Sequence, residues 1–182
     1  MDTDVVKCLP SSGADINLRD ENGQSPLFTA SMYGYCDVVK CLLSSGADIN
    51  LRHDSGQSPL FTASMYGCCD VVKRLLSSSA DINLCDNRGQ SPLFATSMSG
   101  HCDVVKCLLS SGAEINLCDK GGQSPLFIAS MIGHCDVVKC LLSYDADINL
   151  CDDDGLPPLF VASMYRRYDV IDYLLSALLN VS

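Results

Sequence analysis

Cysteine and histidine are the residues of this chain that could bind a metal or act as nucleophiles, and they recur at a spacing of 33 residues. The cysteines fall mainly into three columns, a column being the set of residues at one position of that period. The columns are Cys36, Cys69, Cys102 and Cys135; Cys8, Cys41, Cys107 and Cys140, interrupted by Arg74; and Cys85, Cys118 and Cys151. Neighbours within a column should lie ~8–10 Å apart, whereas a disulfide needs Cα atoms within ~7 Å. We therefore expect free thiols, which are typical of the reducing cytoplasm or nucleus.

The histidines do not complete a metal site in this pattern. His101 and His134 each precede a cysteine, but successive copies should be ~10 Å apart, against metal–ligand distances near ~2 Å. Cys36 and Cys41 are about 140° apart around a helix, and there is no Cys-x-x-Cys pair. The three histidines lie at predicted exposed turns with no partner that the sequence identifies. We predict no metal site and no cofactor.

Carboxylates also recur once in each period. They are Asp15, Asp48, Asp81, Glu114 and Asp147. A catalytic pair of carboxylates would occur once, so the repetition indicates a structural role in the loop after the second helix of each unit. No glycine-rich phosphate loop is present either. We predict that the chain is not an enzyme and has no catalytic residue.

The hexapeptide Gly-Gln-Ser-Pro-Leu-Phe positions these residues. It begins at positions 23, 56, 89 and 122, with a diverged copy at 155. Ser25 suits a helix N-cap, where its hydroxyl accepts from a free backbone N–H, and Pro26 suits the first helical position. Gly23 permits the tight turn before the cap. A fixed period of this length indicates stacked units that share one elongated core.

The first helix of each unit is predicted to be two-sided. In the first unit its buried side carries Leu27, Ala30 and Ser31. Its opposite side carries Thr29, Met32 and Tyr33. Gly34 follows as a left-handed glycine that ends the helix.

The second helix is predicted to bury one broad arc. That arc consists of Val38, Val39, Leu42 and Leu43. The Cys36 column lies at its edge and should behave as a small buried hydrophobe, whereas the Cys41 column should be partly exposed. Gly46 ends the helix, and Ser79 and Asp145 replace it in later units. We expect more strain at Ser79, because Asp tolerates the left-handed conformation better.

The period, the Ser-Pro-Leu-Phe-x-Ala start, the Val-Val-Lys-x-Leu-Leu segment and the Gly-Ala-Asp-Ile-Asn end resemble ankyrin repeats, whose signature is T-P-L-H-x-A. The resemblance covers essentially the whole chain. It implies an all-α ankyrin-repeat solenoid of helix–turn–helix pairs joined by β-turn or hairpin loops. It also implies a partial N-terminal repeat, followed by five repeats. Their ranges are 1–18, then 19–51, 52–84, 85–117, 118–150 and 151–182.

Two features depart from the family pattern. The family's His is replaced throughout by Phe28, Phe61, Phe94, Phe127 and Phe160. We expect each ring to be buried, contributing about 2 kcal/mol. The last unit lacks the serine cap, and Arg166, Arg167 and Tyr168 are expected to cap the end of the stack. Its apolar tail, at Leu178, Leu179 and Val181, should either fold back on the last helix or continue into more protein.

Charge and hydropathy exclude several kinds of partner. The formal net charge of −10 disfavours nucleic acid, because binding to phosphates depends on Lys and Arg. No apolar run approaches the ~18 residues of a membrane span, and the N-terminus lacks the pattern of a signal peptide. We predict a monomer in the cytoplasm or nucleus that is not inserted in a membrane.

The resemblance implies a concave surface, formed by turn tips and first helices, that binds a protein or peptide. The predicted contact residues are Glu21, Met32, Tyr33, Asp54, Met65, Tyr66, Met98, Met131, Ile132, Asp153, Met164 and Tyr165. Met adapts to varied partners, and Tyr is enriched at interface hot spots. Two alternatives stay open: the methionines fill gaps against the preceding turn, and the variable tips reflect drift.

The resemblance also implies a modification. In ankyrin repeats the Asn of Leu-x5-Asp-x-Asn can be hydroxylated by an asparaginyl hydroxylase. The matching residues are Asn50, Asn83, Asn116 and Asn149. A structural role, hydrogen-bonding the loop, is the alternative reason for their presence.

These observations predict a non-catalytic scaffold or adaptor module that binds a protein partner on its concave face. The alternative is a targeting segment of a larger enzyme, channel or adaptor. The half repeat at Met1 and the apolar end at Val181 favour this alternative, and the lack of any other domain favours the first reading.

Overall fold

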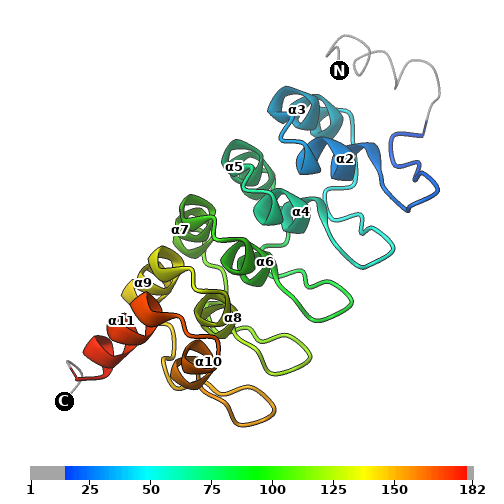
Figure 1. The fold of residues 1–182 in the computed structure, drawn as a ribbon. Helices are drawn as coiled ribbons and strands as arrows, with labels where there is room; N and C mark the ends of the chain where they lie inside the picture. Colours follow the sequence, from blue (N-terminus) through cyan, green and yellow to red (C-terminus); the bar gives the residue numbers. More distant parts are fainter. Residues whose placement is uncertain (1–14, 180–182) are drawn as a thin grey trace.

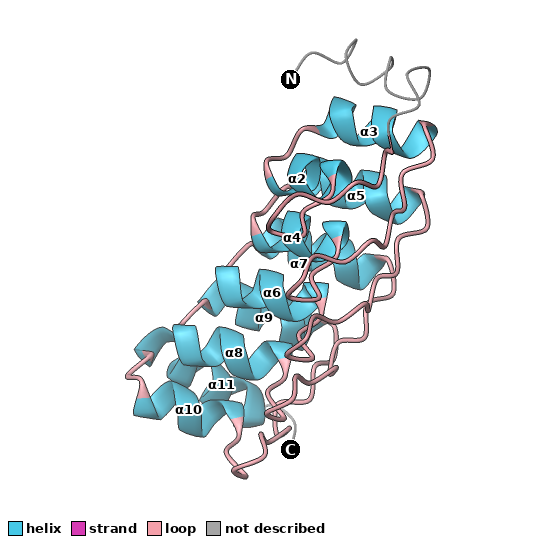
Figure 2. Ribbon diagram, turned by 90° about the vertical axis from the view of Figure 1, so that its right-hand side faces the viewer, coloured by secondary structure: helices cyan, strands magenta, loops and turns pink. Residues whose placement is uncertain are grey.

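The computed structural model describes residues 15–179 as a row of stacked helix pairs (Figure 1). The first helices of the pairs are α2 (Pro26–Met32), α4 (Pro59–Met65), α6 (Pro92–Ser99), α8 (Pro125–Ile132) and α10 (Pro158–Met164). The second helices are α3 (Cys36–Ser44), α5 (Cys69–Ser77), α7 (Cys102–Ser110), α9 (Cys135–Ser143) and α11 (Tyr168–Leu179). The first helices form one row, the second helices form another, and the long loops project from the same edge (Figures 1 and 2). The all-α solenoid is confirmed, and no strand occurs in the part described.

The predicted serine caps start the first helices. Ser25 Oγ accepts from the Phe28 backbone N–H at 3.2 Å. The same bond recurs in the next three repeats, from Ser58, Ser91 and Ser124. In the last repeat Pro157 takes the cap position and offers no side-chain bond. A residue in extended conformation followed by Pro therefore fixes the start of every first helix.

Glycine ends the first helices for two reasons. Gly100 adopts a φ of 81°, which favours glycine, and a Cβ there would lie 2.7 Å from the His134 ring. The next repeat thus approaches the chain at this turn. Arg166 replaces this glycine in the last repeat and still adopts a positive φ of 56°.

The second helices end with a left-handed residue of variable type. Gly46 and Gly112 have φ values of 89° and 90°, and Ser79 and Asp145 keep the conformation at 67° and 64°. A Cβ added at Gly46 or Gly112 would meet nothing within 4 Å. A side chain would therefore fit at this position, and glycine is favoured only because the backbone has a positive φ.

Replacing Ser79 with Gly is expected to raise the free energy of unfolding by about 1 kcal/mol, because a non-glycine residue pays that penalty in the left-handed region. Gly46→Ser should lower it by a similar amount. Urea unfolding followed by circular dichroism measures both changes. Changes of the same sign in the two variants would contradict this explanation.

The core follows the predicted helix faces. Leu27, Ala30 and Ser31 are buried in α2, and Val38, Val39 and Leu42 are buried in α3, whereas Leu43 is half-buried. Four of the five phenylalanines are buried, at Phe28, Phe61, Phe94 and Phe127. The fifth, Phe160, is 50% exposed, so its predicted burial is wrong. Phe28 stacks on His53 of the following repeat, whereas Phe160 has no following repeat within the described residues.

The cysteine columns differ from expectation. Members of the Cys36 column are half-buried rather than buried, because they begin the second helices at the repeat boundary. In the other column, Cys41 and Cys107 are half-buried as expected, but Cys140 is buried. Depth therefore varies within a column, since it depends on the neighbouring repeat.

One of the three residues predicted to cap the last repeat faces the other way. Arg167 Nε donates to Met131 O at 2.9 Å, so this residue faces the preceding repeat rather than the end of the stack. Tyr168 is exposed at the start of α11. Leu178 and Leu179 extend α11 instead of folding back on it, and Val181 lies outside the described residues.

Candidate protein-interaction surface

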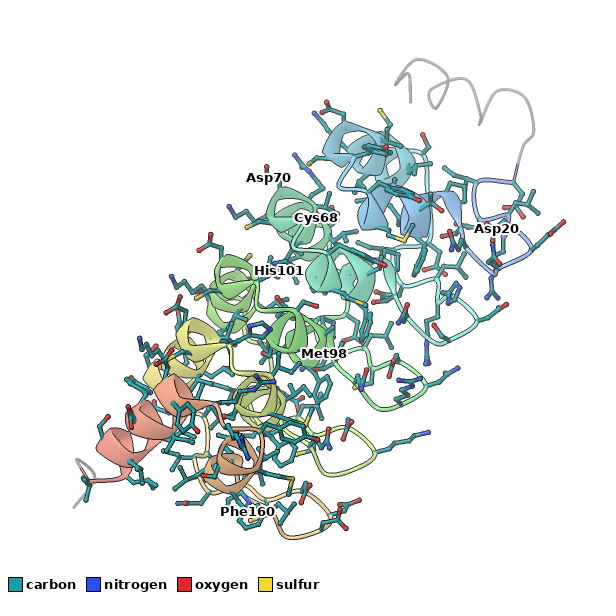
Figure 3. All side chains as sticks on the ribbon, in the orientation of Figure 1. Asp20, Cys68, Asp70, Met98, His101 and Phe160 are labelled. Carbon is teal, nitrogen blue, oxygen red and sulfur yellow. The ribbon has the colours of Figure 1, made fainter. Side chains whose placement is uncertain are left out.

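The C-terminal ends of the first helices form a surface that we call the Met–Tyr row. It consists of Met32, Tyr33, Met65, Tyr66, Met98, Ser99, Met131, Ile132, Met164 and Tyr165. Tyr33 and Tyr66 are 60% and 54% exposed, because the helix has turned them away from the buried side. The first four methionines of the row are half-buried, and Met98 is labelled in Figure 3. The row thus combines partly packed thioethers with exposed aromatic rings.

Two tyrosine rings pack together at the N-terminal end of this row. The rings of Tyr33 and Tyr35 stack with centroids 5.8 Å apart. At the other end, a hollow of about 290 Å³ opens beside Ile132 and is lined by Arg166, Arg167 and Tyr168. The surface is therefore apolar and aromatic at one end and carries two cations at the other.

The first residue of each turn tip has a structural role. Asp20 Oδ1, labelled in Figure 3, accepts from the backbone N–H of Asn22 and Gln24, and this closes the turn. The same pattern occurs at Asp86, Asp119 and Asp152. At His53 the ring Nδ1 takes the place of the carboxylate and accepts from Ser55 N at 3.1 Å. Variation at this position is limited to groups that can accept these bonds.

The second tip residues are exposed. They are Glu21, Asp54, Asn87, Lys120 and Asp153. Some of them also link neighbouring tips: Arg19 forms an ion pair with Asp54, and Arg52 donates to Asn87 Oδ1 at 3.2 Å. Asp54 is thus engaged within the chain on one side and open to solvent on the other.

At two repeat boundaries, the residue after the helix-ending glycine bonds to the preceding repeat. His134 Nε2 lies 3.1 Å from Met98 O, so that nitrogen carries the proton. Cys68 Sγ donates to Met32 O at 3.8 Å. All three histidines are half-buried, so the prediction that they lie at exposed turns is wrong. Sequence reasoning missed this role, although the recurrence of polar or aromatic residues at this position was visible.

The four candidate hydroxylation residues include three that link neighbouring loops. Asn50 Oδ1 accepts from Asp81 N at 3.0 Å, and Asn116 Oδ1 accepts from Asp147 N at 3.1 Å. Asn83 makes two bonds to Glu114, through its Oδ1 and its Nδ2. These bonds hold successive loops in register.

The repeated carboxylates support the same loops. Asp48 Oδ1 accepts from Asn50 N at 3.0 Å, and Asp81 and Asp147 accept in the same way from Asn83 and Asn149. These bonds give the repeated carboxylates the structural role that their repetition predicts. Within residues 15–179, no three His, Cys, Asp or Glu side chains are grouped so that they could hold a metal ion. None of the helices in that range has the length and apolar character needed to cross a membrane.

Stacked two-helix units with a shared core and projecting loops define a helical-repeat protein. A family profile described as ankyrin repeats (3 copies) matches residues 1–86, 66–151 and 93–182. The chain belongs to the ankyrin-repeat family. A search of curated proteins finds no match to this chain. Ankyrin repeats are in general protein–protein interaction modules, and the family is generally non-catalytic.

Proposed function

We propose that this chain is a non-catalytic scaffold or adaptor that binds a protein partner along the Met–Tyr row and the second tip residues. The observation that carries the proposal is the exposure of Tyr33, Tyr66 and Tyr165 along one surface. Exposed tyrosines with adjacent half-buried thioethers provide a large apolar area with hydroxyl groups for hydrogen bonding. We place the protein, as a monomer, in the cytoplasm or nucleus, consistent with its free thiols.

The charge of the surface indicates the chemistry of the partner. Glu21, Asp54 and Asp153 are exposed at the tips, and the chain carries a formal charge of −10. A segment with apolar anchors flanked by Lys or Arg is therefore the best fit, because complementary charge speeds association. The apolar anchors would contact the tyrosines, and the basic residues would lie near the tips.

Partner capture tests the proposal. Proximity labelling in the native cell would compare the wild type with a variant in which Met65, Tyr66, Met131 and Ile132 are changed to Ala. The matched control replaces four exposed residues of the second helices with Ala. They are Asp70, Lys73, Asp103 and Lys106, whose charges cancel. Asp70 lies on the side of the stack away from the loops (Figure 3).

The row variant is expected to lose partners that the control keeps. Loss of hot-spot contacts worth about 2 kcal/mol corresponds to about a 30-fold weaker affinity. Partners that are unchanged in the row variant but lost in the control would place the interaction on the second helices instead.

A second candidate function is the targeting segment of a larger enzyme, channel or adaptor. The observation that favours it is an apolar face at the last repeat, where Phe160 and Leu175 are 50% and 44% exposed. A neighbouring domain would cover these side chains. The mass of the endogenous protein, measured with an antibody to this region, discriminates the two: a mass well above 19.5 kDa supports the second candidate.

We also propose Asn50, Asn83, Asn116 and Asn149 as hydroxylation sites. Mass spectrometry of the protein from its native cell should find peptides heavier by one oxygen atom. Unmodified peptides at all four positions would contradict this proposal.

A further inference from the structure

Two cysteines from neighbouring repeats meet between α7 and α9. Cys102 is the first residue of α7, and its Sγ donates to Asp136 O in the first turn of α9 at 3.7 Å. Within α9, that carbonyl is the acceptor for the N–H of Cys140, one turn later. Helix side chains lean toward the N-terminus, so the Cys140 thiol lies over the turn that contains Asp136. The thiols of Cys102 and Cys140 therefore face each other across this boundary.

At four repeat boundaries a cysteine begins a second helix, but the boundaries differ in the residue at the position of Cys140 in the next second helix. Cys69 begins α5, and Cys107 lies one turn beyond Asp103 in α7, so these two cysteines occupy the positions equivalent to Cys102 and Cys140. Cys36 Sγ donates to Asp70 O and Cys135 Sγ donates to Asp169 O, at 3.8 and 3.6 Å. One turn beyond those carbonyls the sequence has Arg74 and Tyr173 instead of cysteine. Two of these boundaries therefore have two cysteines, and the other two have one.

Cys102 and Cys140 differ in depth. Cys140 is 6% exposed, whereas Cys102 is half-buried. Burial, followed by the neighbouring Cys102, raises the pKa of Cys140 to about 11. Burial, followed by the neighbouring Cys69, also raises the pKa of Cys107. A soluble oxidant therefore reaches the half-buried Cys102 first, and the buried Cys140 remains available to react next.

We propose that the pairs Cys102–Cys140 and Cys69–Cys107 are peroxide-sensitive dithiols that close into disulfides between neighbouring repeats. Hydrogen peroxide reacts with the Cys102 thiolate: an S–O bond forms, the O–O bond breaks, and hydroxide leaves with a sulfenic acid on Cys102. Cys140 then attacks that sulfur as its thiolate, the S–S bond forms, and the S–O bond breaks. Overall, two thiols and one peroxide give one disulfide and two waters. A thiol reductant reverses the reaction.

The proposed pair joins cysteines of two different columns. Neighbours within one column are a repeat apart, but Cys102 and Cys140 belong to different columns and are 38 residues apart in sequence. Cys140 lies one helical turn beyond Asp136, and its side chain leans back toward the boundary that Cys102 contacts. A disulfide there would join the second helices of two repeats and restrict the unfolded chain, so oxidation should raise the urea midpoint.

Peptide mapping of the oxidised full-length chain tests the proposal. The reduced protein is treated with hydrogen peroxide, free thiols are blocked with iodoacetamide, and the tryptic digest is analysed without reduction. The Cys102 peptide, residues 89–106, contains no other cysteine. The Cys140 peptide also contains Cys151, so the experiment is done in a Cys151→Ser background, in which the substituted residue is exposed. We expect a Cys102–Cys140 linked peptide that dithiothreitol removes.

The boundary at Cys135, which has a single cysteine, provides an internal control. Dimedone traps sulfenic acids, and Cys135 has Tyr173 in place of a second thiol, so Cys135 should be labelled while Cys102 is not. Cys140→Ala should abolish the linked peptide, restore dimedone labelling at Cys102, and remove the rise in urea midpoint on oxidation. Helical circular dichroism verifies that this variant is folded. Equal dimedone labelling of Cys102 and Cys135 in the wild type, or crosslinks only between chains, would overturn the proposal.

Discussion

Replacing Phe94 with Ala is expected to lower the free energy of unfolding by about 3–5 kcal/mol, whereas Phe160→Ala should lower it by about 1 kcal/mol or less. The two residues occupy equivalent positions, but Phe94 is 1% exposed and Phe160 is 50% exposed. The difference therefore isolates the contribution of the next repeat. Urea unfolding followed by circular dichroism measures both values, and a smaller effect at Phe94 would show that the cavity collapses.

The physical reason for this contrast lies at the repeat boundary. Phe28 stacks on the His53 ring of the following repeat, with centroids 5.1 Å apart. Phe61, Phe94 and Phe127 are enclosed in the same position, each with a following repeat to cover it. In an array whose stability is a sum of repeat and interface terms, a cavity at Phe94 weakens an interface in the middle of the stack. Equal losses at Phe94 and Phe160 would contradict this account.

The local structure could be predicted from sequence because each signal acts within one repeat. A serine followed by proline determines a helix start, and a glycine with positive φ determines its end. The wheel of the first helix correctly separated the buried Leu27 from the exposed Tyr33. These features depend on residues within one helical turn of each other.

Contacts between repeats could not be predicted in the same way, because the two residues in contact are not separated by 33 positions. Loop bonds join residues 31 apart, as from Asn50 to Asp81, while the turn bonds join residues 36 apart, as from Met98 to His134. The thiol of Cys102 reaches a carbonyl 34 residues away. Each offset depends on the rotation and translation between neighbouring units, which the period of 33 does not contain.

The errors of the sequence reasoning share this cause. The histidines were expected at exposed turns, and Arg167 was expected at the end of the stack, because the sequence does not show which side of a turn meets the preceding repeat. In the structure both kinds of residue reach back to a carbonyl at the end of a first helix. The exposure of Tyr33 and Tyr66 could be predicted more readily, because exposure along one helix follows from its own periodicity.

The second large effect concerns two serines of one repeat. Ser58 and Ser64 are both buried, but Ser58 Oγ accepts from Phe61 N, whereas Ser64 Oγ has no hydrogen-bond partner. Loss of the cap in Ser58→Ala should lower the free energy of unfolding by about 1 kcal/mol. Removing a buried, unpaired hydroxyl in Ser64→Ala should raise it by about 1 kcal/mol. The same substitution is thus expected to have opposite signs at positions six residues apart.

The unpaired hydroxyl recurs, so its effect should accumulate. The other copies are Ser31, Ser97 and Ser130, all buried and without a partner. Changing all four to Ala should raise the free energy of unfolding by about 4 kcal/mol, since sites roughly a repeat apart are close to additive. Ser163 is the matched control, because it is exposed and its hydroxyl donates to Leu159 O at 2.9 Å. Urea unfolding should find Ser163→Ala nearly neutral, and a destabilised fourfold variant would mean that these hydroxyls are bonded in solution.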